Sequence, residues 1–338
     1  MTEGKIIKYA GGAWLFCDMF EKCMKGVLDM TLHHTEKSAA GKKYVSIDIG
    51  GTAIKYGIID ETGNILKRSE MKTEAQKGGP AILEKAVRIV EKLRASDEIS
   101  GICISTAGMV DTEKGEIFYA APLIPDYAGT KFKAVMEEKF QVPCEVENDV
   151  NCAGLAESIS GSAKGSSSTL MLTIGTGIGG CIVLDGKVFH GFSNSACEVG
   201  YMHMFDSDFQ TLGAASILTK KVAERKKESE HIWNGYHIFE EAKAGDDICI
   251  QAIDEMTDFL GRGIANICYV LNPQTVVLGG GIMAQEEYLK EKIKAAVRRY
   301  LVPGIADCTT IKFAKHRNDA GMLGAFYHFM GNHGKIEM

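Results

Sequence analysis

The sequence lacks the features that are typical of several classes of protein. None of its ten cysteines forms a CxxC pair, and several lie inside apolar runs, as Cys103 and Cys181 do. This distribution is typical of small buried side chains in a reducing compartment. It disfavours a disulfide framework or a structural zinc site, which needs closely spaced thiolates. No stretch approaches the about 18 consecutive apolar residues of a membrane span, and the N-terminus lacks the apolar core and cleavage site of a signal peptide. We therefore expect a cytoplasmic protein with no structural zinc site and no membrane partner.

Basic residues are not in excess either. Lys and Arg number 38 against 44 Asp and Glu, the formal net charge is -6, and the basic residues are scattered along the chain. A nucleic-acid backbone is bound by a clustered basic face, so nucleic acid is not an expected partner. The P-loop pattern GxxxxGK[ST] is also absent, which excludes that class of nucleotide site. The 338 residues are enough for two packed domains with a cleft between them.

The first 42 residues differ from the rest of the chain. Apolar residues recur at helical spacing from Trp14 to Leu28, and they predict one amphipathic helix that is followed by a polar linker. This N-terminal helical extension, 1–42, either packs on the body of the protein or is poorly ordered, or else it docks a partner or DNA. Packing on the body or poor order is favoured over docking, because a DNA-binding helix-turn-helix motif needs two helices.

The body of the chain begins at Tyr44 with a strand, a glycine-rich turn at 50–52 and a second strand. The same pattern returns at 169–184 around a denser glycine-rich turn at 175–180. Between them, apolar spacing predicts a helix from about 80 to 93. Strands alternating with helices indicate an α/β fold. The repeated hairpins suggest an internal duplication, with a cleft between the two domains.

Three glycine-rich turns follow apolar strands, at 50–52, 175–180 and 279–281. Glycine has no Cβ, so the backbone N–H groups of such turns can approach an anion closely. Asp48 ends the strand before the first turn, where a carboxylate can hold Mg²⁺, and Lys55 follows that turn. The second turn superficially resembles the GxGxxG dinucleotide pattern, but it leads into a strand and not a helix. The three turns together predict nucleotide binding.

A polar cluster at 147–151 follows the apolar strand 142–146 and leads into a helix. Asn148 or Asp149 could simply cap this helix, which is the usual role of these residue types. However, four polar residues at one junction exceed what a cap needs. The alternative makes Asp149 a general base, which accepts the proton of a hydroxyl group that attacks a phosphate.

These motifs, in this order, resemble those of the ROK (repressor, open reading frame, kinase) family. The resemblance runs from about Tyr44 to Phe326 and includes Glu198-Val199-Gly200. Kinases of this family belong to the actin/hexokinase/Hsp70 superfamily, so the resemblance implies two duplicated ribonuclease-H-like domains that flank a cleft. The implied parts are a small N-terminal kinase domain at 43–158, joined by a C-terminal helix within 320–338, and a large C-terminal kinase domain at 159–319.

The resemblance also implies a sugar substrate, with ATP and Mg²⁺ as cofactors. It makes Asp149 the catalytic base and places Asp48 near the Mg²⁺ that comes with ATP. The residues implied to bind ATP are Asp48, Gly50, Gly51, Thr52, Lys55, Gly175, Thr176, Gly177, Gly280 and Gly281. Those implied to bind the sugar are Gly108, Asn148, Asp149, Glu198, Tyr201 and Gln210.

The sequence departs from the family pattern where zinc is expected. The family usually has ExGH, whose histidine ligates zinc, whereas here the fourth residue is Tyr201. Tyrosine is a poor zinc ligand but a good partner for hydroxyl groups. The cysteine cluster that normally follows is absent from 202–211, Gln210 replaces its later glutamate, and His203 is interpreted as structural. These departures resemble a zinc-free subgroup labelled β-glucoside kinase or glucokinase, with zinc-free N-acetylmannosamine kinases as the nearest rival.

The resemblance therefore implies an ATP-dependent sugar kinase, with the 6-OH of glucose or of a β-glucoside as the favoured acceptor and a homodimer as a weaker expectation. The alternatives are an N-acetylmannosamine kinase, a sugar-sensing transcriptional repressor and an actin-like or Hsp70-like ATPase. Repressors of the family carry a winged helix-turn-helix before the kinase-like body, for which 1–42 is short. A polymer-forming ATPase has no need of the hydroxyl-binding cluster at 147–149 and Glu198.

Overall fold

A computed structural model describes residues 41–334 of the protein. The chain divides into two compact units, Met1–Lys42 and Lys43–Met338. The helix expected between Trp14 and Leu28 lies outside the described residues. Within residues 41–334, no helix is both long and apolar enough to cross a membrane.

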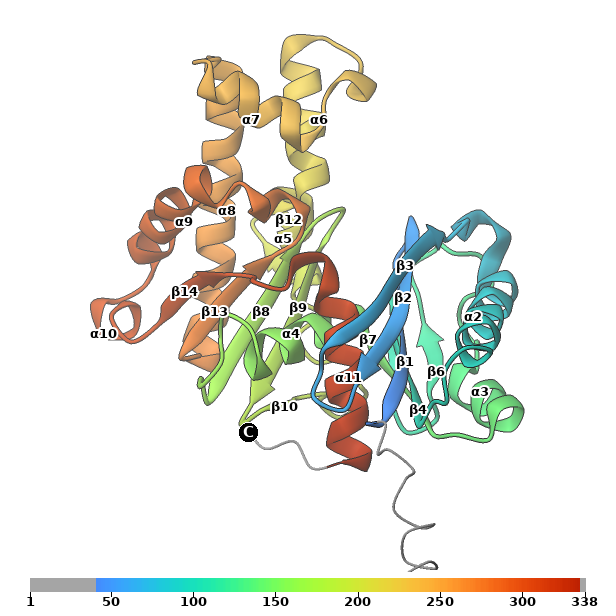
Figure 1. The fold of residues 1–338 in the computed structure, drawn as a ribbon. Helices are drawn as coiled ribbons and strands as arrows, with labels where there is room; N and C mark the ends of the chain where they lie inside the picture. Colours follow the sequence, from blue (N-terminus) through green and yellow to red (C-terminus); the bar gives the residue numbers. More distant parts are fainter. Residues whose placement is uncertain (1–40, 335–338) are drawn as a thin grey trace, which may run out of the picture. The chain divides into compact units, whose positions relative to one another are not determined.

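The first half of the described chain forms a five-stranded sheet in the order β3-β2-β1-β4-β7 (Figure 1). The central strand, β1, pairs antiparallel with β2 and parallel with β4, and β7 extends the parallel side. The five strands are β1 (Lys43–Ile49), β2 (Ala53–Asp60), β3 (Ile65–Lys72), β4 (Gly101–Thr106) and β7 (Cys144–Asn148). The helices that pack with this sheet are α2 (Gly78–Arg94) and α3 (Phe132–Phe140), and a short hairpin is formed by β5 (Met109–Asp111) and β6 (Glu116–Tyr119).

The second half repeats this arrangement. Its sheet has the order β10-β9-β8-β13-β14, with β8 antiparallel to β9 and parallel to β13. The strands are β8 (Ser168–Ile174), β9 (Ile178–Leu184), β10 (Lys187–Val188), β13 (Thr275–Gly279) and β14 (Thr310–Phe313). Each sheet thus has an antiparallel hairpin side and a parallel side around one central strand. The predicted α/β fold with an internal duplication is confirmed.

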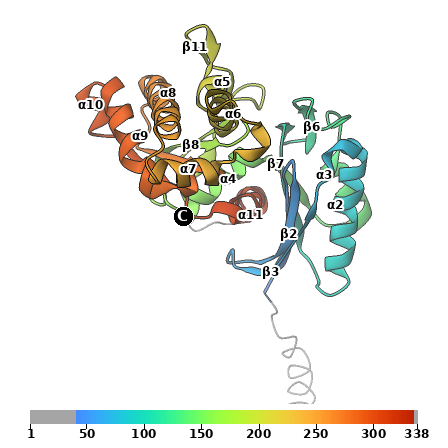
Figure 2. The same ribbon diagram turned by 90° about the horizontal axis from the view of Figure 1, so that it is seen from above.

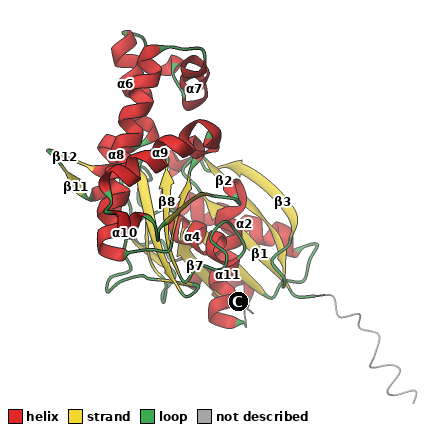
Figure 3. Ribbon diagram, turned by 90° about the vertical axis from the view of Figure 1, so that its left-hand side faces the viewer, coloured by secondary structure: helices red, strands yellow, loops and turns green. Residues whose placement is uncertain are grey.

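Helices after β10 cover and extend the second sheet. They are α5 (Phe209–Gly213), α6 (Ala215–Lys226), α7 (Gly235–Lys243), α8 (Asp247–Leu271), α9 (Glu286–Tyr300) and α10 (Pro303–Ala306). Figures 1 and 3 both show α6 and α7 projecting beyond the end of the sheet. The short hairpin β11 (His203–Met204) and β12 (Ser207–Asp208) precedes α5.

Two helices lie between the sheets, α4 (Asp149–Ile159) and α11 (Ala320–His333) (Figure 2). They cross closely at Gly324, since a Cβ there would overlap the backbone carbonyl of Cys152 in α4. Their apolar side chains form one core with residues of both sheets, such as Cys103 of β4 and Val277 of β13. The helix α4 begins at the carboxyl end of β7, so the crossing fixes the place of its first residue, Asp149. The division at residues 158 and 159 stays a prediction.

Candidate active site

Asp149 lies at the junction between β7 and α4. The preceding residue, Asn148, is the N-cap of α4, and its Oδ1 accepts hydrogen bonds from the backbone N–H groups of Val150 (2.8 Å) and Asn151 (3.1 Å). Its Nδ2 donates to the carbonyl oxygen of Gly108 (2.9 Å) and to Oδ1 of Asp149 (3.1 Å). Capping is therefore the task of Asn148, as such residues often do, and Asp149 is not needed for it.

The Asp149 carboxylate has one engaged and one available oxygen. Oδ1 accepts from the Val150 N–H group at 2.9 Å as well as from Asn148. Within the described residues, Oδ2 accepts no hydrogen bond from another side chain. The side chain is only partly exposed, into a pocket. One oxygen of the carboxylate is thus oriented by the protein, and the residue lines the pocket.

The pocket around Asp149 has a volume of about 180 Å³ and brings together five of the residues expected at a sugar site. These are Gly108, Asn148, Asp149, Glu198 and Tyr201. Asn148 and Gly108 come from the first sheet and its loops, whereas Glu198 precedes and Tyr201 ends the 3₁₀ turn Val199–Tyr201, which follows β10. Tyr119 of β6 also lines the pocket, and it and Tyr201 are each about half exposed.

Burial and neighbouring acids raise the pKa of Asp149 to about 7. Burial is the largest cause, the negative charge of Asp48 the next, and Glu198 adds to it, while the Val150 N–H group acts in the opposite direction. Burial also raises the pKa of Glu198. A carboxyl group with a pKa near 7 exchanges its proton readily at neutral pH, which is what a general base requires.

Asp48 is the second-to-last residue of β1 and lies beside the start of α11. Burial raises the pKa of Asp48, against the hydrogen bond from Ser105 Oγ (2.7 Å) and the charge of Lys55, whose Nζ lies 3.9 Å away. Gly321 permits this position, since a Cβ there would collide with the Asp48 carboxylate. Asp48 therefore lies at the N-terminus of α11, where the helix dipole favours a negative charge.

Each of the three glycine turns has one glycine with open space around it, whereas neighbours such as Gly177 and Gly280 are closely packed. A Cβ at Gly51, Gly175 or Gly281 would meet no atom within 4 Å, and none of the three has a positive φ. Neither backbone strain nor packing against the described residues therefore requires glycine at these positions. The close approach of a ligand does explain it.

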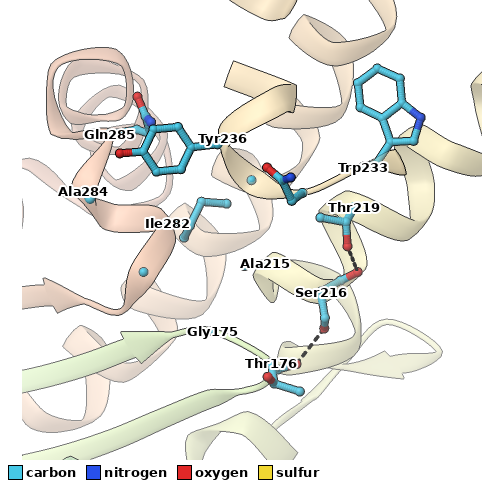
Figure 4. A pocket seen from close by; sticks show the side chains of 13 residues that line it. Gly175, Thr176, Ala215, Ser216, Thr219, Trp233, Tyr236, Ile282, Ala284 and Gln285 are labelled. Atoms are coloured by element: carbon cyan, nitrogen blue, oxygen red, sulfur yellow. Dashed lines mark hydrogen bonds between the residues drawn. The ribbon is translucent and has the colours of Figure 1, made fainter. Parts of the chain in front are cut away.

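A second and larger pocket, of about 680 Å³, lies beside the turns of the second sheet (Figure 4). Gly175, Thr176 and Gly281 line it, and Ser216 Oγ donates to the Thr176 carbonyl oxygen at 2.6 Å. The rest of the lining comes from α6, α7 and the residues after β13. Members that sequence reasoning missed are Ser216, Thr219, Trp233, Asn234, Tyr236, Ile282 and Gln285. No motif marks them in the sequence.

Comparison with known proteins assigns the family. Residues 44–331 match the ROK family. The chain belongs to the ROK family. An uncharacterised protein of Clostridium perfringens (strain 13 / Type A) is 49% identical over 292 residues, covering 86% of this chain and 99% of the relative. The β-glucoside kinase of Klebsiella pneumoniae is 33% identical over 85% of this chain and 96% of its own. A ROK family glucokinase from Streptomyces griseus, solved in complex with glucose and AMPPNP, has a TM-score of 0.73 and 25% identity over 84% of this chain and 97% of its own.

Some residues expected from the ROK pattern lie outside these two pockets. Gly280, with a φ of 96°, lines a neighbouring pocket of about 360 Å³ together with Arg317 and Asn318. Lys55 lies near it, since its Nζ is 3.5 Å from Asn318 Oδ1. The turn at 50–52 lines none of these three pockets, although Thr73 Oγ1 holds it through the Gly50 carbonyl oxygen at 2.6 Å.

Gln210, which was expected at a sugar site, does not line the pocket around Asp149. A Cβ added at Gly177 would lie 2.7 Å from Oε1 of Gln210, and a Cβ added at Gly200 would lie 3.1 Å from the same atom. Gln210 therefore fills the space between the second glycine turn and the segment that carries Glu198 and Tyr201. Within residues 41–334, no group of three or more His, Cys, Asp or Glu side chains is placed to bind a metal ion.

Proposed function

We propose that the protein is an ATP-dependent sugar kinase that transfers the γ-phosphoryl group of MgATP to the 6-OH of glucose or of a β-glucoside. The observation that carries this proposal is Asp149, a carboxyl group with a pKa near 7 in a pocket with Asn148, Glu198 and Tyr201. The names of the ROK relatives, glucokinase and β-glucoside kinase, support it.

Asp149 is the general base of the proposed reaction. Its Oδ1 is held by the Val150 N–H group and by Asn148, so Oδ2 receives the proton of the attacking hydroxyl. General-base catalysis contributes about 10²- to 10⁴-fold in rate. Asn148 and Glu198 bind the other hydroxyl groups of the sugar, because an amide and a carboxylate suit a ring of donors and acceptors.

The phosphates of ATP bind at the glycine turns, because Gly51, Gly175 and Gly281 face open space and no side chain there blocks the approach of an anion to the backbone. The Asp48 side chain suits the Mg²⁺ of MgATP, since this ion usually takes one or two carboxylates and completes its shell with phosphates and water. When bound, Mg²⁺ neutralises charge on the transferred phosphate. Lys55, beside Asp48, adds a positive charge on the same side.

The adenosine occupies the pocket of about 680 Å³, whose size is in the range of a nucleotide-sized ligand. Figure 4 shows the side chains of Tyr236, Ile282 and Gln285 around this space. An aromatic ring and an aliphatic side chain suit the faces of a purine, while an amide suits its edge.

The residues at the mouth of the smaller pocket favour a β-glucoside as the sugar. Tyr119 and Tyr201 lie close enough there that Tyr119 helps to raise the pKa of Tyr201, after burial as the main cause. Both rings are about half exposed. Exposed tyrosines at the mouth suit the apolar face of a second sugar ring or an aryl group, as in a β-glucoside.

The decisive test measures ADP release at fixed MgATP over a panel of sugars that contains glucose, mannose, N-acetylmannosamine, cellobiose and an aryl β-glucoside. The proposal expects the highest kcat/KM with glucose or a β-glucoside. A highest value with N-acetylmannosamine selects that alternative, and no sugar-stimulated ADP release contradicts a sugar kinase altogether.

The remaining expectations are tested separately. We infer a cytoplasmic location because ATP is abundant there, and a fluorescent fusion in the source cell would check it. The homodimer is checked by light scattering on the purified chain. Binding to operator DNA in a gel shift would favour the repressor alternative.

A further inference from the structure

The side chain of Glu147, for which sequence reasoning assigned no role, joins two parts of the site. It lies on β7 two residues before Asp149 and is 1% exposed. Its Oε1 accepts from the backbone N–H group of Asn148 at 2.7 Å and from Nδ2 of Asn151 at 3.0 Å. One oxygen of this carboxylate therefore holds both sides of the junction that carries Asp149.

The other oxygen of Glu147 contacts a different segment of the chain. Its Oε2 lies 2.6 Å from Nε2 of His190, which follows β10 of the second sheet. The carbonyl oxygen of His190 accepts from the N–H group of Ala196 at 3.1 Å, and this hydrogen bond closes a loop of seven residues. Cys197 and Glu198 follow the loop directly. The Glu147 carboxylate thus reaches the base of the loop that presents Glu198 to the pocket.

The charges favour this contact as an ion pair. Burial would raise the pKa of Glu147, but the hydrogen bond from His190, with the nearby His328, brings it below its ordinary value. The hydrogen bond to Glu147 raises the pKa of His190. His328 of α11 completes the cluster, with Nδ1 3.5 Å from Oε2 of Glu147. Removing the partner of a buried carboxylate strongly destabilises the folded protein, because the charge is then left uncompensated.

We propose that Glu147 and His190 form a positioning pair that fixes Glu198 relative to Asp149. The proposal rests on the sugar-kinase function above, since it concerns how the sugar is held before its hydroxyl meets the base. A loop tied only at β10 would let Glu198 shift, and a misplacement of about 1 Å can cost about 10²-fold in rate. The nucleotide pocket does not depend on this loop, because its lining comes from other segments.

The chain offers a matched control on the same strand. Glu145, two residues before Glu147, is 4% exposed and lies 2.6 Å from Nε2 of His333 at the end of α11. This pair is again a buried carboxylate and a histidine, and neither of its residues lines any of the pockets described above, although Glu145 also accepts from Nζ of Lys133 at 3.1 Å and His333 is more exposed than His190 (38% against 26%). A role that is merely structural predicts similar effects of the two histidines.

The experiment compares His190→Ala, His190→Gln and His333→Ala with the unchanged protein, measuring kcat and the KM values for sugar and MgATP, together with thermal unfolding. Alanine at 190 is expected to raise the sugar KM by about tenfold and leave the MgATP KM within about twofold. Glutamine places an amide donor near the position of Nε2, so it restores most of the loss. His333→Ala changes neither KM.

Several results overturn the positioning role. These are an unchanged sugar KM in His190→Ala, an equal rise of both KM values, no recovery with glutamine, or the same KM effect in His333→Ala. If His190→Ala does not fold, His190→Phe against His333→Phe decides instead, because phenylalanine keeps a ring of similar size but donates no hydrogen bond. A sugar KM raised about tenfold in His190→Phe alone supports the pair, and an unchanged sugar KM, or one raised only as much as the MgATP KM, overturns it. A protein that shows no sugar-stimulated turnover before any substitution contradicts the proposed function instead.

Discussion

Asp149→Asn gives the sharpest test of the proposed chemistry, because it predicts opposite changes in activity and stability. Asparagine has the same shape, and its Oδ1 can still accept from the Val150 N–H group at the position where the aspartate accepts at 2.9 Å. The substitution removes only the charge and the capacity to take a proton. Turnover should fall by about 10²- to 10⁴-fold, while the KM for sugar changes little.

The stability change follows from the raised pKa. An acid whose folded-state pKa lies above its unfolded value binds more protons in the folded state, so the stability falls as pH rises from 3.8 to about 7. A rise of about three pKa units corresponds to about 4 kcal/mol. Water in the pocket screens the charge of Asp149 and reduces this penalty. We therefore expect Asp149→Asn to raise the free energy of unfolding by about 2 kcal/mol at pH values near 8.

The assay is thermal unfolding of both proteins at two pH values, together with ADP release. Near pH 8 the variant should unfold about 5 °C higher than the unchanged protein. Near pH 5, where Asp149 is already protonated in the folded state, the difference should shrink towards zero. A gain that is equal at both pH values would show that Asp149 is not held neutral by its surroundings. Undiminished turnover would show that it is not the base.

Four further substitutions test other parts of the structure. Gly281→Ala places a methyl group in open space, so the free energy of unfolding should stay within about 0.5 kcal/mol while the KM for MgATP rises several-fold; an unchanged KM would show that no ligand uses this turn. Gly324→Ala drives a methyl group into the Cys152 carbonyl and should lower the free energy of unfolding by about 2 kcal/mol in urea titrations. An unchanged free energy of unfolding would show that α4 and α11 do not cross closely there. Tyr236→Ala should raise the KM for MgATP by about tenfold with the sugar KM unchanged, and a change in the sugar KM instead would place the nucleotide elsewhere. Tyr201→Ala should lower kcat/KM for aryl β-glucosides by about tenfold relative to glucose, and an equal loss for both sugars would exclude a contact with the aglycone.

The parts of the fold that were predictable from sequence have local causes. A helix was expected at about 80 to 93 and is observed at Gly78–Arg94, because its apolar spacing requires a single face. The repeated strand-turn-strand pattern at 50–52 and 175–180 predicted the duplication, because a tight turn leaves a mark in a few adjacent residues. The junction at Asp149 was visible for the same reason.

Contacts between distant residues left no such mark. Glu147 and His190 are 43 residues apart, and neither position is unusual in its own segment. The pocket beside Gly175 is lined by α6 and α7 residues of ordinary type, which converge only because these helices and the residues after β13 meet beside the second glycine turn. Gln210 was expected to touch the sugar, but its side chain packs behind Gly177 and Gly200, whose missing Cβ atoms leave room for it.

The electrostatics of the site link the two substrates. Asp48, Asp149 and Glu198 all have raised pKa values, with burial as the largest cause, and the first and last raise the pKa of Asp149 further. An ionised carboxylate in such surroundings is stabilised by a cation or by donated hydrogen bonds. In the proposed complex, MgATP supplies the cation beside Asp48, and the hydroxyl groups of the sugar donate hydrogen bonds to Glu198. The Mg²⁺ of MgATP thereby weakens the repulsion that Asp48 exerts on the other two carboxylates, so binding of MgATP should favour binding of the sugar and, by thermodynamic linkage, the reverse. The same repulsion helps to raise the pKa of Asp149 to about 7, so in the proposed mechanism the charge of Glu198 would contribute to catalysis as well as to sugar binding.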